Sequence, residues 1–136
     1  MRERNGGCQC GGTRYKVTGE PKQVLACHCV DCQKQSGSAF GLVMVVEEEA
    51  FQLTKGKVRS FVSTSDAGRE KTGAFCPDCG SRIYHVIAWR PGMLSVRAGT
   101  LDDTCWLEPT VHLWTRSKQP WVIIPEGVTA YETQPG

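Results

Sequence analysis

The sequence has no long apolar run and almost no net charge. Its most apolar stretch, Phe40 to Val46, has the length of a strand and falls far short of the roughly 20 residues that a membrane helix needs. Sixteen Lys and Arg residues nearly balance fourteen Asp and Glu residues, which gives a formal net charge of +2. These absences argue against a membrane-spanning protein, and against nucleic acid or an anionic membrane as the main partner.

The sequence also has no repeats, no low-complexity tracts and no evident linker between domains. A chain of 136 residues has the usual size of one domain, so we expect a single domain over residues 1–136. The N-terminal MRERNGGCQC has charges but no apolar segment behind them, and it therefore shows no signal peptide. We expect a cytoplasmic protein whose thiols stay reduced.

The spacing of the apolar residues favours strands over helices. Strand-like runs, some alternating and some continuously apolar, occupy residues 13–19, 39–46, 57–63, 80–86, 93–99, 110–115 and 121–125. Fifteen glycines and seven prolines interrupt these runs at short intervals, as turns between strands do. We expect one short helix from Cys32 to Gln35, ended by Gly37, and one further helical turn at residues 101–106. The sequence thus predicts a mainly β fold built from small sheets.

Cysteine is abundant, with eight residues in the chain. In a reducing compartment, cysteines at short spacings indicate metal ligands or catalytic thiols rather than disulfides. Seven of them fall into three groups, which are GGCQCGG (Cys8, Cys10), ACHCVDC (Cys27, Cys29, Cys32) and FCPDCGSR (Cys76, Cys79). Cysteines one residue apart are poorly placed to bond each other, but two thiolates can converge on one ion. The pattern predicts zinc.

Seven thiolates can be divided between metal sites in two ways. One division builds a four-cysteine ribbon from the second and third groups and leaves the first group and Cys27 without a role. The other joins the first group to the third, which gives a four-cysteine cluster and leaves the second group as a three-cysteine cluster. We favour the second division because it uses every cysteine of the three groups. A closed site with four ligands contributes folding energy, whereas a site with three keeps a position open for water or substrate.

The alternative is a second closed site, whose fourth ligand is His28, His85, His112 or Cys105. We consider it less favoured, because His28 lies between two ligands and the other three lie far along the chain. His85 and His112 lie in strand-like runs and are typical of structural histidines, and Cys105 is typical of a free, partly buried thiol. The four tryptophans are expected in the core or in the wall of a pocket, and they are Trp89, Trp106, Trp114 and Trp121.

Five motifs together resemble those of the glutathione-dependent formaldehyde-activating enzyme family, which shares its domain with animal centromere protein V. They are, in order, GGCQCGGTRYKVTGEP, CHCVDCQKQSGSAFG, FCPDCGSRIY, VRAGTLDD and HLWTRSKQPWV. The resemblance runs from about Gly6 to Trp121 and implies a β-tent fold of small antiparallel sheets around two zinc ions. It also implies that Cys8, Cys10, Cys76 and Cys79 hold a structural zinc and that Cys27, Cys29 and Cys32 hold a catalytic zinc.

The activity that the resemblance implies is that of a carbon–sulfur lyase. Glutathione and formaldehyde, the expected small-molecule partners, condense to S-hydroxymethylglutathione. Two alternatives stay open, namely an enzyme of the same fold for another small thiol or carbonyl compound, and a non-catalytic zinc-binding interaction module. Lys34, Arg82 and Arg97 are candidates to offset thiolate charge or to bind carboxylates, although each alone is typical of a solvated surface. No residue stands out in the sequence as the general acid or base.

Overall fold

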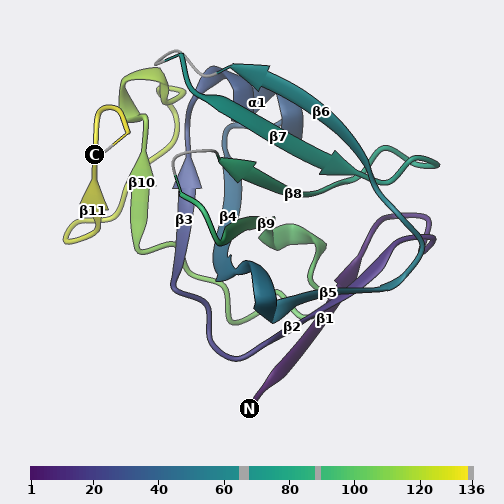
Figure 1. Ribbon diagram of the computed structural model, residues 1–136. Helices are drawn as coiled ribbons and strands as arrows, with labels where there is room; N and C mark the ends of the chain where they lie inside the picture. The colour runs from purple at the N-terminus through teal and green to yellow at the C-terminus, as the bar shows by residue number, and fades with distance from the viewer. Residues whose placement is uncertain (65–67, 88–89, 135–136) are drawn as a thin grey trace.

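The computed structural model describes residues 1–64, 68–87 and 90–134, and strands dominate this part of the chain (Figure 1). One sheet has three strands in the order β1-β2-β5, with neighbouring strands antiparallel. Its members are β1 (Glu3–Gly7), β2 (Arg14–Thr18) and β5 (Phe51–Lys55). This small sheet crosses the lower right of the molecule in Figure 1, beside the larger sheet.

The larger sheet has eight strands in the order β11-β10-β3-β4-β9-β8-β7-β6. Its members are β3 (Gln23–Cys27), β4 (Gly41–Glu47), β6 (Arg59–Thr64), β7 (Glu70–Phe75), β8 (Arg82–Ile87), β9 (Met93–Arg97), β10 (Val111–Leu113) and β11 (Thr129–Ala130). The mainly β prediction is confirmed. The sheet is antiparallel except at β10, which runs parallel to both β3 and β11. A parallel partner cannot be reached by a hairpin, so β10 arrives beside β3 only after a long excursion of the chain.

Helical segments are short, as expected. Helix α1 (Val30–Ser36) begins two residues before the predicted start and ends at Gly37, whose φ of 61° a residue with a Cβ rarely adopts. Three single turns of 3₁₀ helix are η1 (Glu48–Ala50), η2 (Ala98–Thr100) and η3 (Thr115–Ser117). In the described part of the chain, no helix is both long and apolar enough to cross a membrane.

Two local predictions were wrong. Residues 101–106 form turns rather than a helical turn, because the Asp103 carboxylate accepts a hydrogen bond from the Cys105 N–H and so stabilises a turn. Residues 121–125 form no strand. Trp121 and Ile123 are 69% and 87% exposed although Val122 is buried, and the prolines at either end, Pro120 and Pro125, cannot donate to a β-ladder.

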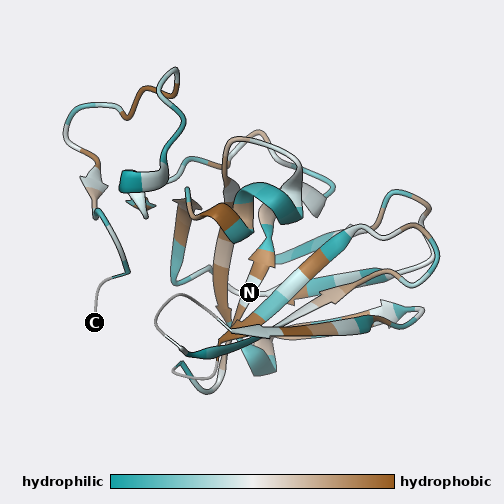
Figure 2. Ribbon diagram, turned by 90° about the horizontal axis from the view of Figure 1, so that it is seen from above, coloured by the Kyte–Doolittle hydropathy of each residue, from teal (hydrophilic) through white to brown (hydrophobic). Residues whose placement is uncertain are grey.

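The main core lies between the two sheets. Its largest fully buried side chains include Tyr15 of β2, Met44 of β4 and Ile83 of β8, and Figure 2 shows brown, hydrophobic segments along the strands of the main body. The Tyr15 ring stacks on Phe51 at a centroid distance of 5.0 Å, and its hydroxyl lies 2.7 Å from the Thr100 hydroxyl. A Cβ on Gly6 would lie 2.5 Å from that same tyrosine oxygen, so only glycine fits there.

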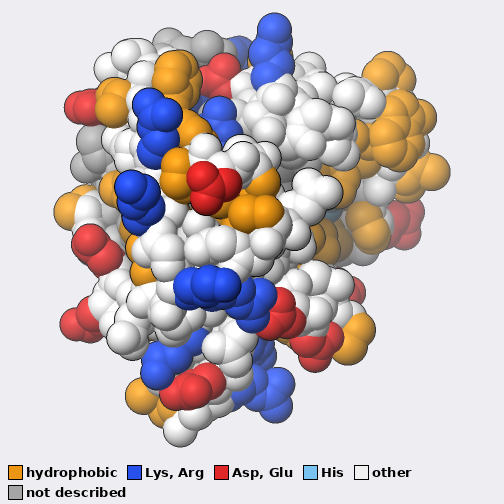
Figure 3. Space-filling view, turned by 90° about the vertical axis from the view of Figure 1, so that its right-hand side faces the viewer, with side chains coloured by type: hydrophobic (Ala, Val, Ile, Leu, Met, Phe, Trp, Pro, Cys, Tyr) orange, Lys and Arg blue, Asp and Glu red, His pale blue; other side chains and the backbone are white. Residues whose placement is uncertain are grey.

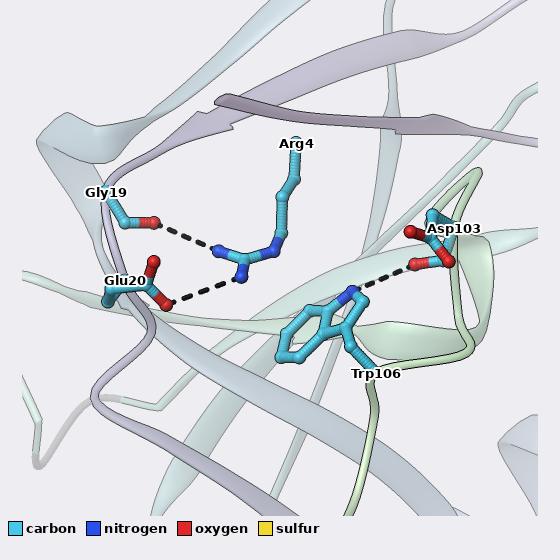
Figure 4. Close-up of polar contacts among 5 residues, drawn as sticks. All are labelled: Arg4, Gly19, Glu20, Asp103 and Trp106. Carbon is cyan, nitrogen blue, oxygen red and sulfur yellow. Dashed lines mark hydrogen bonds and ion pairs between the residues drawn. The ribbon is translucent and has the colours of Figure 1, made fainter. Parts of the chain in front are cut away.

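The loop after η2 is fastened to the first strand through Arg4, as Figure 4 shows. The Arg4 guanidinium lies 4.1 Å from the centroid of the Trp106 ring and donates to the Gly19 carbonyl at 3.4 Å. The Trp106 indole in turn donates to the Asp103 carbonyl at 3.0 Å. Trp106 therefore packs at the edge of the core, as expected, whereas Trp121 is 69% exposed and Trp89 lies outside the described residues.

Candidate metal centres and the adjoining cavity

The structure brings the first and third cysteine groups together. The Sγ atoms of this four-cysteine cluster all lie within 4.8 Å of one another, and its members are Cys8, Cys10, Cys76 and Cys79. The Cys8 and Cys10 sulfurs are 3.5 Å apart, and the Cys10 and Cys76 sulfurs are 3.8 Å apart. Zinc–sulfur bonds of about 2.3 Å in a tetrahedron place neighbouring sulfurs just under about 4 Å apart, so the arrangement fits a zinc ion.

Hydrogen-bond donors surround these sulfurs. The backbone N–H of Thr13 points at the Cys8 sulfur at 3.2 Å, and that of Gly12 points at the Cys10 sulfur at 3.4 Å. The Ser81 hydroxyl lies 3.3 Å from the Cys79 sulfur and contributes most to lowering the Cys79 pKa to about 5. Donors to sulfur stabilise thiolates, which are the form that binds metal.

The second group forms the separate three-cysteine cluster, whose sulfurs also lie within 4.8 Å of one another. Cys27 ends β3, Cys29 caps the N-terminus of α1, and Cys32 lies in the first turn of that helix. The Cys29 sulfur accepts a hydrogen bond from the Cys32 N–H at 3.3 Å, in the place where a serine or aspartate oxygen usually caps a helix. The change from strand to helix is what lets three sulfurs converge, because side chains two residues apart in a strand are separated by about 6.6 Å.

No fourth ligand joins the three-cysteine cluster. Within the described ranges, no His, Cys, Asp or Glu lies within 4.8 Å of all three sulfurs. His28 is fully buried, and its Nε2 lies 2.8 Å from Nδ1 of His112, so the two rings form a pair of their own. His85 lines the cavity beside the cluster but is not one of the clustered ligands. Cys105 is exposed rather than partly buried. None of the four alternative ligands completes a closed site.

The loop that carries the three cysteines is tied to the segment after β10. The His28 N–H donates to the Leu113 carbonyl at 2.9 Å, and the Gln33 amide donates to the carbonyls of His28 at 2.8 Å and Ser117 at 2.9 Å. The Gln33 side-chain oxygen accepts from Gln119 at 3.1 Å. The Gln33 amide group is therefore satisfied at both ends, which holds the loop in one place.

Ionisation of one thiol in this cluster opposes ionisation of the other two. Hydrogen bonds to Cys29 and Cys32 raise the pKa of Cys27, while Cys27 and Cys29 stabilise one thiolate at Cys32 and lower its pKa well below the ordinary value. A bound divalent cation deprotonates coordinating thiols outright, and three soft sulfur donors are the ligands that zinc prefers. The three sulfurs therefore fit zinc, and a tetrahedral ion bound there would have one open coordination position.

The three-cysteine cluster opens onto a cavity of about 230 Å³. One wall is apolar, and its residues are Leu25, Val30, Val43, Val45, Ile87, Leu113 and Trp114. The polar lining includes His85 and three basic residues, Arg69, Lys71 and Arg90. Lys71 is largely buried and forms an ion pair with Asp31 at 2.8 Å. Burial, followed by the charge of Arg97, lowers the His85 pKa to about 3, so this imidazole is neutral at physiological pH.

The basic residues singled out in the sequence have separate positions. Lys34 is exposed, as a surface residue would be, and the Arg82 guanidinium lies 5.6 Å from the centroid of the Phe75 ring. Arg97 is only 8% exposed, which overturns its interpretation as a surface residue. Sequence reasoning did not find Lys71 or Arg90, because each lies on or after a strand that meets the cysteines only through the order of the sheet. Elsewhere, basic and acidic side chains are interspersed over the face shown in Figure 3.

Comparison with known proteins agrees with these features. The family model described as glutathione-dependent formaldehyde-activating enzyme matches residues 3–117. Two curated relatives share the name "Putative glutathione-dependent formaldehyde-activating enzyme". The protein of Penicillium rubens is 32% identical over 108 residues, and that of Phaeosphaeria nodorum is 28% identical over 107 residues. Each alignment covers 75% of this chain and 55% of the relative, so the chain spans about half the length of the curated relatives it matches.

A solved structure shares the fold. The crystal structure of a Rhodobacter sphaeroides protein superposes with a TM-score of 0.60 at 16% sequence identity, covering 74% of this chain and 89% of that one. At this identity the likeness concerns the fold alone. The family model spans most of the chain and includes both cysteine clusters. The chain therefore belongs to the glutathione-dependent formaldehyde-activating enzyme family.

Proposed function

We propose that this protein is a cytoplasmic zinc-dependent carbon–sulfur lyase that forms and cleaves S-hydroxymethylglutathione from glutathione and formaldehyde. The observation that carries the proposal is the three-cysteine cluster, which opens onto a cavity and has no fourth ligand among the described residues. Family membership supports the choice of substrates. The four-cysteine cluster, whose sulfurs suffice for a closed tetrahedron, is assigned a structural zinc ion.

The reaction is an addition without oxidation or reduction. The sulfur of the thiol bonds to the aldehyde carbon, the carbonyl π bond opens, and the thiol proton ends on the new hydroxyl oxygen. A zinc ion held by Cys27, Cys29 and Cys32 would supply a vacant coordination position, which binds a thiolate or polarises a carbonyl oxygen. The remaining tasks are to bind the peptide, to exclude water and to move one proton.

The cavity residues are suited to these tasks. The apolar wall around Val45 and Leu113 excludes water from the sulfurs, which strengthens electrostatic interactions at the cluster. The lining has three cations, Arg69, Lys71 and Arg90, and one carboxylate, Asp31, and this excess of positive charge suits the two carboxylates of glutathione. A neutral imidazole has one nitrogen that accepts a proton and one that donates, and we assign His85 to the proton of the adduct's hydroxyl.

The test is exchange NMR on glutathione, formaldehyde and their adduct at equilibrium, with zinc-loaded protein. We expect faster interconversion than in buffer, loss of the acceleration in Cys32→Ala, and retention in Cys105→Ala. Cys105 is an exposed cysteine outside both clusters, so the second variant controls for the loss of a thiol. Circular dichroism establishes that each variant is folded. No acceleration by folded protein that carries two zinc ions would overturn the assignment of the substrates.

The apolar wall favours a second candidate, an enzyme of the same fold that acts on another small thiol or carbonyl compound. Seven apolar side chains line a cavity of about 230 Å³, and a small apolar thiol would match this wall better than a charged tripeptide. The same NMR experiment with a series of thiols separates the two candidates. Acceleration with an apolar thiol, together with none for glutathione, would favour the second.

A further inference from the structure

Arg97 carries a positive charge into the interior of the protein. It is the last residue of β9, its Cα lies opposite Val43 of β4, and only 8% of the residue is exposed. One terminal nitrogen, Nη2, donates to the side-chain oxygen of Gln35 on α1. The other, Nη1, is buried and has no hydrogen-bond partner among the described residues. Within those residues, no carboxylate lies within 4.0 Å of the guanidinium.

A buried charge of this kind requires compensation. Transfer of an unpaired cation from water to the protein interior is strongly unfavourable, and an arginine cannot escape the cost by losing its proton. Buried charges are therefore paired with an opposite charge or satisfied by hydrogen bonds. Gln35 satisfies one nitrogen and contributes no charge, so the compensating anion must come from elsewhere.

The three-cysteine cluster lies beside the orphaned nitrogen. A Cβ built on Gly41 would lie 2.4 Å from Nη1 of Arg97 and 3.5 Å from the Cys32 sulfur, so the guanidinium and the thiol flank the same glycine. No side chain other than hydrogen fits between them without displacing the guanidinium.

We infer that Arg97 is the counter-cation of the metal-loaded three-cysteine cluster. Three thiolates and one divalent ion would carry a net charge of −1, and the buried guanidinium beside Cys32 would offset that charge. Arg97 is thus a positioning residue that stabilises the loaded state, and Gly41 is the position that admits it. The inference rests on the metal site of the proposed function and is independent of its substrate.

The test compares Arg97→Met, which removes the charge at similar length, with Arg97→Lys, which retains it. Each protein is equilibrated in chelator-buffered zinc, its free thiols are alkylated, and peptide mass spectrometry reports the protection of each cysteine. We expect Arg97→Met to require about 10–100-fold more free zinc to protect Cys27, Cys29 and Cys32, as loss of an outer-shell partner typically does. We expect Arg97→Lys to stay within about threefold of the wild-type protein.

The four-cysteine cluster is the internal control, and its zinc dependence should be unchanged in both variants. Unchanged protection of the three-cysteine cluster in folded Arg97→Met would overturn the inference. So would an equal loss at both clusters, because it would indicate general destabilisation. Since the readout is bound zinc, failure of the glutathione assay leaves this result intact.

A second pair of variants tests the geometry without changing any charge. Gly41→Ala forces Nη1 away from Cys32, whereas Gly99→Ala adds a methyl group where no atom lies within 4 Å. We expect Gly41→Ala to weaken zinc protection of the three-cysteine cluster and Gly99→Ala to leave it unchanged. Equal protection in the two variants would show that the position of the guanidinium is immaterial, and the inference would fail.

Discussion

Trp114 combines an unfavourable backbone with a place in the cavity wall. Its φ of 59° and ψ of 41° are left-handed, and it is the one residue other than glycine with positive φ in the described part of the chain. Its ring lines the cavity, and the Arg116 guanidinium lies 4.9 Å from the ring centroid. A left-handed conformation costs a residue with a Cβ about 1–2 kcal/mol. We expect the indole to be retained for the cavity, at a cost in stability that substitution can reveal.

Trp114→Ala and Trp114→Gly both delete the indole, so their difference isolates the backbone. At an ordinary position, glycine is less stable than alanine by about 0.5–1 kcal/mol because its unfolded state has more freedom. At Trp114, alanine keeps the left-handed cost of about 1–2 kcal/mol and glycine avoids it. The usual order should therefore reverse, with Trp114→Gly more stable than Trp114→Ala by about 0.5–1 kcal/mol.

The measurement is thermal unfolding at fixed free zinc, because bound metal contributes to stability by mass action. A difference of this size shifts the melting temperature by about 2–5 °C in a domain of this length. Gln52 on β5 is an exposed strand residue, and the same pair there should show the ordinary order, with alanine the more stable. Equal stability of the two Trp114 variants, or greater stability of the alanine variant, would refute the reasoning.

Two further predictions concern stability. Gly56→Ala should destabilise the protein by at least about 1 kcal/mol more than Gly127→Ala in thermal melts, since both glycines have positive φ but only a Cβ on Gly56 would meet a backbone atom, 2.0 Å from the Gly12 carbonyl oxygen; equal losses would contradict the contact. In the folded protein, burial and then the neighbouring His112 lower the pKa of His28 to about 4. Below pH 6.5, His28 therefore binds a proton in the unfolded chain but not in the folded protein. Stability should therefore fall as pH falls from about 6.5 to 4, and His112→Leu, which removes one of the three histidines whose pKa burial lowers, should flatten the plot of melting temperature against pH; an unchanged slope would exclude the His28–His112 pair as its source.

The grouping of the cysteines followed from short-range spacing. Three sulfurs within six residues can meet as soon as a strand gives way to a helix, and the CPDC turn needs only Gly80, whose φ is 78°. Such features are local, so the sequence contains them directly. The strand runs were also recognisable where apolar residues alternate, as at Arg14–Thr18. Glu3–Gly7 is polar and glycine-rich, and it becomes a strand only because β2 offers it an edge.

The features that escaped prediction depend on long-range neighbours. The burial of Arg97 arises because β9 pairs with β4 and α1 covers its end, and no pattern within five residues of Arg97 reports that arrangement. Lys71 lines the cavity because the strand order β9-β8-β7 brings β7 to that side of the sheet, and this order is not visible in the sequence around Lys71. The open centre was thus predictable in its sulfurs, and not in the cations and apolar wall that surround it.

The parallel pairing of β10 with β3 has a consequence for the order of events during synthesis. Cys27 is opposite Leu113 in the sheet, and the N–H of His28, the next residue, donates to the Leu113 carbonyl. Leu113 is translated 85 residues after His28. A nascent chain that has emerged as far as Cys79 contains every sulfur of both clusters, yet the ribosome still holds the strand that seats the three-cysteine loop. The three-cysteine cluster, although its cysteines are close in sequence, is therefore the later of the two clusters to be packed against all its neighbouring strands. With zinc assigned to both clusters as proposed, the closed centre would fill first on the growing polypeptide when zinc is scarce, and the open one only near the end of translation.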